Sequence, residues 1–248
     1  MNPLLFLHGF TGSRKLWDEF RNNLNLPTIS IDCPGHGNNL IKNLSKPYTF
    51  EDWQREFNLF LYQNNLKKIN LCGYSMGGRL AISIATAFPE KINSLILIST
   101  SAGISNEVEQ KNRIQKDTKL CNKIINDFQT FLNEWENLDF FSKQKVRNPQ
   151  AFKTQREIRE NQNPQQLAYI LKNLGTGNMP NYWGKIPAFD FPVLIICGNE
   201  DEKYCTISKR LKDYIPNSQL KIIHNSGHAP HIDQLDEVAR VIQNFIKS

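Results

Sequence analysis

The stretch CGYSMGGR at residues 72–79 constrains the fold more than any other, because it places Ser75 between two glycines with the spacing G-x-S-x-G. An apolar run over 68–72 precedes it, and a segment with helical periodicity over 76–87 follows. A sharp strand-to-helix turn of this kind exposes the serine hydroxyl above a sheet, and the glycines permit close backbone packing. The stretch predicts a reactive Ser75; an incidental serine in a glycine-rich turn is the alternative.

The rest of the chain alternates short apolar runs with amphipathic segments, which predicts an α/β fold with a mostly parallel sheet and helices on both faces. Thr49 is expected to cap one helix, with a glutamate two residues later rather than the ideal three. The predicted strands lie within 3–9, 28–37, 68–72, 94–100, 191–198 and 219–228, and the predicted helices are 14–24, 49–66, 76–87, 204–214 and 235–248.

Residues 101–190 interrupt this alternation. They contain no β-type run, and their long polar segments have helical character, separated by Pro149 and Pro164. We therefore expect a core formed by 1–100 and 188–248, and a helical cap, or lid, inserted at 101–187 over one edge of the sheet.

Composition excludes several classes of protein. Hydrophobic residues make up 40% of the 248 residues and charged residues 22%, which indicates a soluble globular core. No apolar run approaches the ~18 residues of a membrane helix, and the N-terminal segment lacks the basic region of a signal peptide. The five scattered cysteines form no C-x-x-C pair, so we expect reduced thiols. These features predict a cytoplasmic protein without membrane insertion.

The formal net charge of +6 does not by itself indicate a partner. The basic residues are spread along the chain rather than gathered in one stripe, so we expect no nucleic-acid binding. A solvated basic surface and a few arginines facing a small anionic ligand both remain open. No metal cluster, nucleotide-binding loop or cofactor motif is visible, so no metal or cofactor is expected. The oligomeric state, monomer or homodimer, is left open.

A reactive serine needs a base and an orienting acid, which follow in the chain order Ser, Asp or Glu, His on this kind of sheet. The segment CGNEDEKY offers Asp201 after one predicted strand, and NSGHAPH offers His228 after the next. Both positions are loops beyond strand ends, where ligands bind in open parallel sheets. His231 is the rival base and His224 falls inside the predicted strand, but His228 directly follows a glycine in the loop.

Two backbone N–H groups should form an oxyanion hole. One belongs to Met76, the residue after the serine, and the other to the loop LHGFTG after the first strand, at Phe10. The N-terminus of the helix that begins near Met76 adds its positive dipole end. Negative charge that develops on a substrate oxygen would be stabilised there.

Two cationic residues lie beside the predicted catalytic positions. Arg79 follows Ser75 by four residues and so lies on the same helix face, and Lys203 follows Asp201 by two. Solvated side chains are the simple interpretation. The other interpretation is that the ligand is an anion.

The motifs LHGFTG, PGHG, GYSMGGR, CGNEDEK and SGHAPH resemble the α/β-hydrolase superfamily. GYSMGGR, the insertion pattern NRIQKD…FLNEW…REIRENQNPQQLAYILKNLGTGNMPNYW and CGNEDEKY are similar to the finer family of 2-succinyl-6-hydroxy-2,4-cyclohexadiene-1-carboxylate synthases, enzymes of menaquinone and phylloquinone biosynthesis. The resemblance spans nearly the whole chain and implies the α/β-hydrolase fold.

The resemblance also implies site residues. It implies a triad of Ser75, Asp201 and His228, and Arg156 competes with Arg159 for one of the further roles. The implied substrate-binding residues are Tyr74, Arg79, Arg113, Trp135, Arg159 and Lys203, of which the arginines would bind carboxylates.

The implied reaction is the elimination of pyruvate from 2-succinyl-5-enolpyruvyl-6-hydroxy-3-cyclohexene-1-carboxylate, a tricarboxylate, with Ser75 as the base. An esterase or thioesterase, a carbon–carbon bond hydrolase and a non-catalytic binding protein of the same fold are the alternatives. Two departures from the family stand out. The chain starts at the strand before the oxyanion loop, without the two strands that many relatives place first, so we expect an exposed sheet edge. Glu136 follows Trp135 where some relatives have an aromatic residue.

Overall fold

The computed structural model describes residues 2–138 and 143–247, and these build one parallel sheet of six strands in the order β2-β1-β3-β4-β5-β6. Every pair of neighbouring strands is parallel. The strands are β1 (Leu4–Leu7), β2 (Thr28–Ile31), β3 (Ile69–Tyr74), β4 (Ile92–Ile98), β5 (Val193–Gly198) and β6 (Ser218–Ile223).

The order of the strands reverses between β1 and β3. From β1 the chain moves outward to β2 at one edge, and it then returns to β3 on the other side of β1 and continues toward β6. Ligands bind at such a reversal, beyond the carboxyl ends of the strands, because the adjoining loops diverge there. The turn at Ser75 follows β3 and therefore lies at this position.

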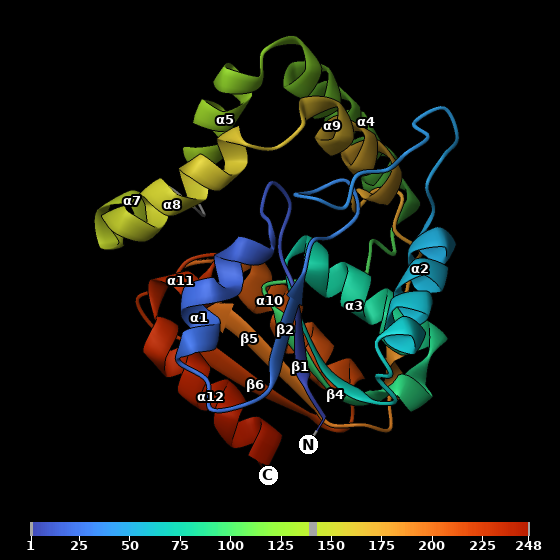
Figure 1. Ribbon diagram of the computed structural model, residues 1–248, viewed down its shortest axis with the longest axis vertical. Coiled ribbons are helices and arrows are strands. Elements are labelled where there is room, and N and C mark those ends of the chain that lie inside the picture. Colours follow the sequence, from blue (N-terminus) through green and yellow to red (C-terminus); the bar gives the residue numbers. More distant parts are fainter. Residues whose placement is uncertain (1, 139–142, 248) are drawn as a thin grey trace.

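Helices cover both faces of the sheet (Figure 1). On one face lie α2 (Phe50–Gln63), α3 (Met76–Ala87) and α10 (Glu202–Tyr214), and on the other lie η1 (Arg14–Trp17), α1 (Asp18–Asn22) and α12 (Leu235–Lys247). Alternation along β1 divides the core accordingly, because Leu5 and Leu7 join the first cluster while Leu4 and Phe6 join the second. The predicted fold class is confirmed.

Two predicted segments contain shorter elements. The segment 14–24 divides into η1 and α1, and the segment 28–37, predicted as a strand with its loop, has its strand over Thr28–Ile31 and its loop after that. The side chain of Asp32 accepts hydrogen bonds from the Arg14 N–H at 2.8 Å and the Asn38 N–H at 3.1 Å, and these bonds turn the chain back directly after the strand. An aspartate in a turn supplies acceptors that a strand ladder would otherwise provide.

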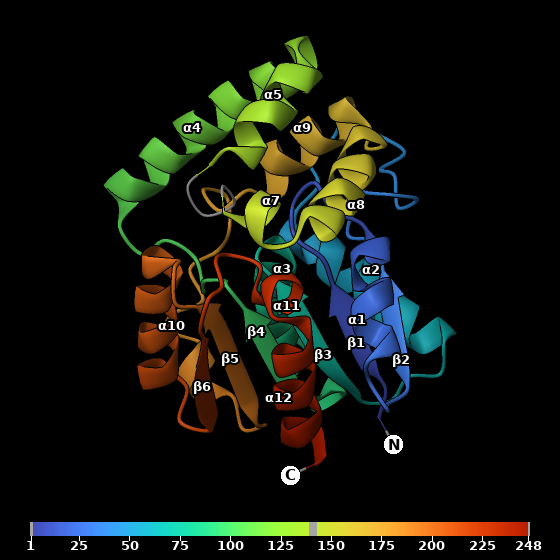
Figure 2. The same cartoon turned by 90° about the vertical axis from the view of Figure 1, so that its left-hand side faces the viewer.

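Between β4 and β5 the described residues form helices and no strand. Figures 1 and 2 show these helices beyond the carboxyl ends of the strands. We call them the cap: α4 (Glu107–Asn126), α5 (Phe128–Glu136), α7 (Gln144–Arg147), α8 (Pro149–Glu160) and α9 (Pro164–Leu174). Residues of α4, α5 and α9 share an apolar cluster of their own. That 101–187 forms a separate cap domain stays a prediction.

Asparagine or aspartate side chains start most of the cap helices. Asn106, Asp127, Asn148 and Asn163 accept the N–H of the third residue of α4, α5, α8 and α9, respectively. Such caps satisfy one of the N–H groups that a helix start leaves without a partner. The shorter elements of the fold are η2 (Pro89–Lys91), η3 (Ile186–Ala188) and α11 (Pro230–Asp233).

The sheet edge at β2 is partly covered by Arg21. Its Nη2 donates to the Thr28 carbonyl at 3.2 Å, and its Nη1 donates to the Ser30 hydroxyl at 3.0 Å. A charged side chain on an edge strand opposes pairing with another strand. None of the described helices is long and apolar enough to cross a membrane.

The start of α2 yields a stability prediction. Thr49 and Asp52 form a reciprocal capping box, so the acid stands at the ideal third position and the sequence prediction overlooked it. Replacing Thr49 by Ala should lower the free energy of unfolding by about 1 kcal/mol, measured by urea denaturation. Thr118→Ala is the control, because that exposed hydroxyl only bonds the preceding turn of α4 and should change stability by less than about 0.5 kcal/mol.

Candidate active site

Ser75 stands in a strained turn between β3 and α3, with φ 52° and ψ −108°. A positive φ in a residue other than glycine costs of order 1–3 kcal/mol and persists only where its surroundings fix it. The Ser75 N–H donates to the Ile98 carbonyl at 2.9 Å, and the Thr100 hydroxyl donates to the Ser75 carbonyl at 2.8 Å. Gly77 must be a glycine, because a Cβ there would lie 2.3 Å from the Leu7 carbonyl oxygen.

The structure brings Ser75, His228 and Asp201 together in one hydrogen-bonded chain. His228 Nε2 lies 3.0 Å from Ser75 Oγ, and His228 Nδ1 lies 2.6 Å from Asp201 Oδ2. Because an ionised carboxylate only accepts hydrogen bonds, Nδ1 carries the proton and Nε2 is left to accept from the serine hydroxyl. This is the arrangement that lets a histidine remove the serine proton.

Asp201 and His228 are held by the loops that follow β5 and β6. Asp201 is the N-cap of α10, and its second oxygen accepts the Tyr204 N–H at 3.1 Å, which orients the carboxylate. His228 lies in the loop after β6. The loops meet closely, since a Cβ on Gly198 would lie 2.1 Å from the Gly227 carbonyl oxygen.

The rival histidines occupy other environments. His231 is buried behind Tyr74, with its ring 4.4 Å from the Tyr74 ring and 4.5 Å from that of Trp17. Neither of its ring nitrogens has a hydrogen-bond partner among the described residues. Burial, with a smaller contribution from the charge of His228, lowers its pKa from 6.5 to about 3, so His231 is a neutral packing residue. His224 is exposed just after β6 rather than inside it.

The residues predicted to form an oxyanion hole flank the serine. Met76 is the first residue of α3, so its N–H has no partner within the helix. Phe10 follows Gly9, where an added Cβ would lie 3.5 Å from Ser75 Cβ, so this loop passes next to the serine. The Phe10 ring also contacts Trp135 of the cap at a centroid distance of 5.6 Å.

Three cations, Arg79, Arg113 and Lys203, converge from α3, α4 and α10, and we call them the cationic cluster. Burial, followed by the charge of Arg113, lowers the pKa of Arg79 to about 10. Partial burial, again followed by the charge of Arg113, lowers the pKa of Lys203. Arg113 Nε binds Asp117 at 2.8 Å, and Arg79 donates to the Thr176 hydroxyl. One carboxylate thus pairs with a group of mutually repelling cations, which favours an anionic ligand.

Arg159 is held differently from the cationic cluster. Its Nη1 binds the buried carboxylate of Glu136 at 2.8 Å, and its Nη2 donates to Gln155 at 3.0 Å. Arg156, the competing candidate, binds the other oxygen of Glu136 at 3.0 Å. Burial lowers the pKa of Arg159, and the Glu136 hydrogen bond opposes this shift. Glu136, noted in the sequence as a departure from the family, therefore lies between the two arginines.

The rings of Tyr74 and Tyr204 both contact His228. Their rings lie 5.5 Å and 4.5 Å from that of His228. Burial raises the pKa of both phenols; the charge of Arg159 opposes this shift at Tyr74, and Arg79 opposes it at Tyr204. Tyr204 was missed in the sequence analysis. The sequence did contain a signal for it, because Tyr204 lies three residues after Asp201, in the first turn of the helix that starts there.

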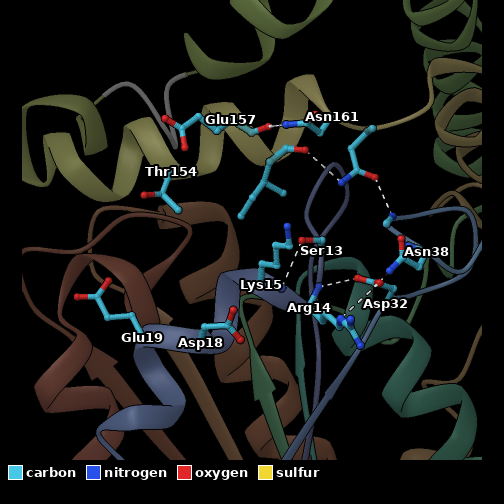
Figure 3. A pocket seen from close by; sticks show the side chains of 13 residues that line it. Ser13, Arg14, Lys15, Asp18, Glu19, Asp32, Asn38, Thr154, Glu157 and Asn161 are labelled. Carbon is cyan, nitrogen blue, oxygen red and sulfur yellow. Dashed lines mark hydrogen bonds and ion pairs between the residues drawn. The ribbon is translucent and has the colours of Figure 1, made fainter.

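A large cavity elsewhere is separate from this site. It has a volume of about 650 Å³ and lies between η1, the loop after β2 and α8 (Figure 3). Of the described residues that line it, none is a predicted site residue. Its polar groups form hydrogen bonds with one another. Asp32 accepts from the Arg14 N–H. The Gln162 side chain accepts from the Gly37 N–H at 3.0 Å and donates to the Gly12 carbonyl at 3.0 Å.

Comparison with known proteins shows what the chain is related to. The α/β hydrolase fold family matches residues 2–235. A Bacillus subtilis (strain 168) protein that carries the provisional name 2-succinyl-6-hydroxy-2,4-cyclohexadiene-1-carboxylate synthase is 36% identical, over 98% of this chain and 89% of its own length. The chain belongs to this synthase family, within the α/β hydrolase fold.

Further members of the synthase family agree. The enzyme of that name from Enterobacter sp. (strain 638) is 25% identical over 98% of this chain and 91% of its own length. The solved structure of MenH from S. aureus superposes with a TM-score of 0.94 and 33% identity, covering 99% of this chain and 93% of that one. The predicted family is thus confirmed.

The environment of His231 yields a pH prediction. Since its folded-state pKa of about 3 lies below the ordinary value of 6.5, the unfolded state binds a proton more readily and stability falls as the pH drops below 6.5. His231→Phe should keep the stacking on Trp17 and Tyr74. It should also reduce the pH slope of the free energy of unfolding by up to about 1.4 kcal/mol per pH unit between about pH 6 and pH 4. Urea denaturation over that range measures the slope, and an unchanged slope would contradict a neutral buried His231.

Proposed function

We propose that this chain is a 2-succinyl-6-hydroxy-2,4-cyclohexadiene-1-carboxylate synthase. It eliminates pyruvate from 2-succinyl-5-enolpyruvyl-6-hydroxy-3-cyclohexene-1-carboxylate, in menaquinone or phylloquinone biosynthesis in the cytoplasm. The observation that carries the proposal is the cationic cluster beside the Ser75–His228–Asp201 chain of hydrogen bonds. Family membership supports the same conclusion.

In the proposed reaction, Ser75 acts as a base rather than as a nucleophile. His228 Nε2 accepts the serine proton, and Asp201 stabilises the imidazolium that forms. The serine oxygen then removes a proton next to the succinyl carbonyl. The resulting enolate oxygen lies under the N–H groups of Met76 and Phe10, which stabilise its charge.

The bond between the ring and the enolpyruvyl oxygen breaks next. Electrons from the enolate form a second ring double bond, the oxygen leaves with its three-carbon group, and the proton held by the Ser75–His228 pair is available for the departing pyruvate. Water is not consumed. The substrate carries three carboxylates, and the guanidinium fork of an arginine matches a carboxylate with two parallel hydrogen bonds.

We assign the carboxylates to cations of the core and the cap. Arg79, Arg113 and Lys203 are only partly neutralised, by Asp117, and they bind the first anionic groups. Arg159 shares Glu136 with Arg156, so a ligand carboxylate there meets two arginines that already hold one carboxylate between them. Tyr74 and Trp135 complete the wall of the pocket.

Pyruvate release tests the proposal. The full chain should release pyruvate from the enzymatically prepared substrate, measured by coupling to lactate dehydrogenase, and Ser75→Ala should lower kcat about 10³-fold or more. The serine hydrolase alternative instead predicts turnover of p-nitrophenyl esters through an acyl-enzyme. Ester turnover without pyruvate release would overturn the synthase assignment, and a ligand bound equally well and unchanged by both forms would indicate a binding protein.

The arginines give a separate prediction. Arg113→Ala and Arg159→Ala should each raise KM for the tricarboxylate roughly 10-fold or more, because a charge-assisted hydrogen-bonded pair is lost. Arg240→Ala, an exposed position on α12, is the control and should leave KM unchanged. Steady-state kinetics measure the effect. If both arginine variants match the control, the assigned carboxylate contacts are wrong.

A further inference from the structure

Arg147, the last residue of α7, joins the cap to two loops of the core. Its Nη1 binds Asp233 Oδ2 at 2.8 Å, and its Nη2 binds Glu200 Oε1 at 2.8 Å. Figure 2 shows α7 above α11, the short helix that ends at Asp233. One guanidinium therefore holds a carboxylate from each of two separate core segments.

Each of these carboxylates is adjacent to a residue of the Ser75–His228–Asp201 chain. Asp233 Oδ2 accepts the Gly227 N–H at 2.8 Å, and Gly227 directly precedes His228. Glu200 directly precedes Asp201. Arg147 thus fixes, through one residue on each side, the loop of the acid and the loop of the base.

The contact between Arg147 and Asp233 is largely shielded from solvent. The Asp233 side chain is 2% exposed and that of Arg147 is 19% exposed. A pair with a buried partner is little screened by solvent, and removal of one member leaves an uncompensated charge. The neighbouring Gln144 side chain is also buried and donates to Asp233 Oδ1 at 3.2 Å.

A chain of amide hydrogen bonds extends this contact into the cap. Gln144 Oε1 accepts from Gln155 at 2.9 Å, and Gln155 Oε1 accepts from Arg159 Nη2 at 3.0 Å. Asp233 is therefore linked at one end to the loop of His228 and at the other to the arginine that we assign to a substrate carboxylate. Packed interactions of this kind transmit a displacement of one element to the next.

We propose that Arg147 is a positioning residue that aligns His228 and Asp201 with Ser75 by fixing their loops to the cap. It does not contact the reacting atoms. Only the measurement of pyruvate release rests on the proposed function, because the alignment of the serine with its base would serve any activity at this site. Loss of Arg147 should slow proton removal from Ser75 while the cationic cluster stays in place.

The test measures the reactivity of Ser75 with a fluorophosphonate. The Ser75 oxygen attacks phosphorus, an O–P bond forms, the P–F bond breaks with loss of fluoride, and His228 takes the serine proton. Arg147→Met should lower the labelling rate roughly 10- to 100-fold, because small misplacements of catalytic groups have effects of this size. Lys123→Met, which breaks an ion pair between α4 and α5 within the cap, should label at the parental rate.

The pH dependence separates positioning from a general loss of structure. Without Arg147, Lys143 still pairs with Glu200 at 3.1 Å, but Asp233 is left as an unpaired anion. The groups that face His228 are Asp201, Tyr204, Tyr74 and His231. None of these groups is substituted in the variant, so the negative charge left at Asp233 favours the imidazolium. The acid limb of the labelling profile should then move up by roughly half a pH unit.

Rescue and fold controls complete the experiment. Arg147→Lys keeps the charge and can pair with one carboxylate, so its labelling rate should lie between those of the parent and Arg147→Met. Circular dichroism and urea denaturation check folding. If Arg147→Met does not fold, Glu200→Gln replaces it, because it breaks one arm of the fork at a 24% exposed carboxylate. Its labelling rate should then fall as well.

The outcomes distinguish the two proposals. Parental labelling rates and an unshifted acid limb in the folded variants would overturn the positioning role, whatever the natural substrate is. If the parent protein releases no pyruvate but Arg147→Met is labelled more slowly than the parent, the positioning role is supported and the synthase function is contradicted. In a synthase, kcat of Arg147→Met for pyruvate release should fall with the labelling rate, while KM changes by less than about 3-fold.

Discussion

The strained turn at Ser75 is the constraint on which the rest of the site depends. It exists because α3 starts directly against β1, where only a glycine at position 77 leaves room for the Leu7 carbonyl. The Ser75 N–H donates to the adjacent strand β4 and the Thr100 hydroxyl donates to the Ser75 carbonyl, and these hydrogen bonds hold the unfavourable φ. The serine therefore stands clear of the sheet, within 3.0 Å of the histidine supplied by a distant loop.

Charge is distributed unevenly around this turn. The cationic cluster lies on the side toward Tyr204, where burial, followed by repulsion from Arg113, lowers the pKa values of Arg79 and Lys203. In the cap, Glu136 sits between Arg156 and Arg159 and limits the excess of positive charge there. An anionic ligand would relieve the repulsion in the first region, and this supports our proposal of a polycarboxylate rather than a neutral ester as the substrate.

Much of the fold was predictable because periodicity and turn residues act locally. The strand and helix order, the helical character of the insertion and the sequence of serine, acid and base along the chain all followed from short segments. Boundaries were less predictable. Within 28–37, predicted as a strand and its loop, the strand ends at Ile31, because the Asp32 side chain binds N–H groups of Arg14 and Asn38 that come from outside the strand. Long-range bonds of this kind leave no local signal.

By itself, the sequence determined the chemistry available at each loop: a hydroxyl at 75, a carboxylate at 201, imidazoles at 228 and 231, and guanidinium groups in the insertion. Only the tertiary structure decided which of them act together. It places His228 between serine and acid and packs His231 between aromatic rings, although the two are three residues apart. It also engages Arg147 with the core. The physical reason is that hydrogen bonds and ion pairs depend on separations of a few ångströms in space, which packing of the whole chain sets.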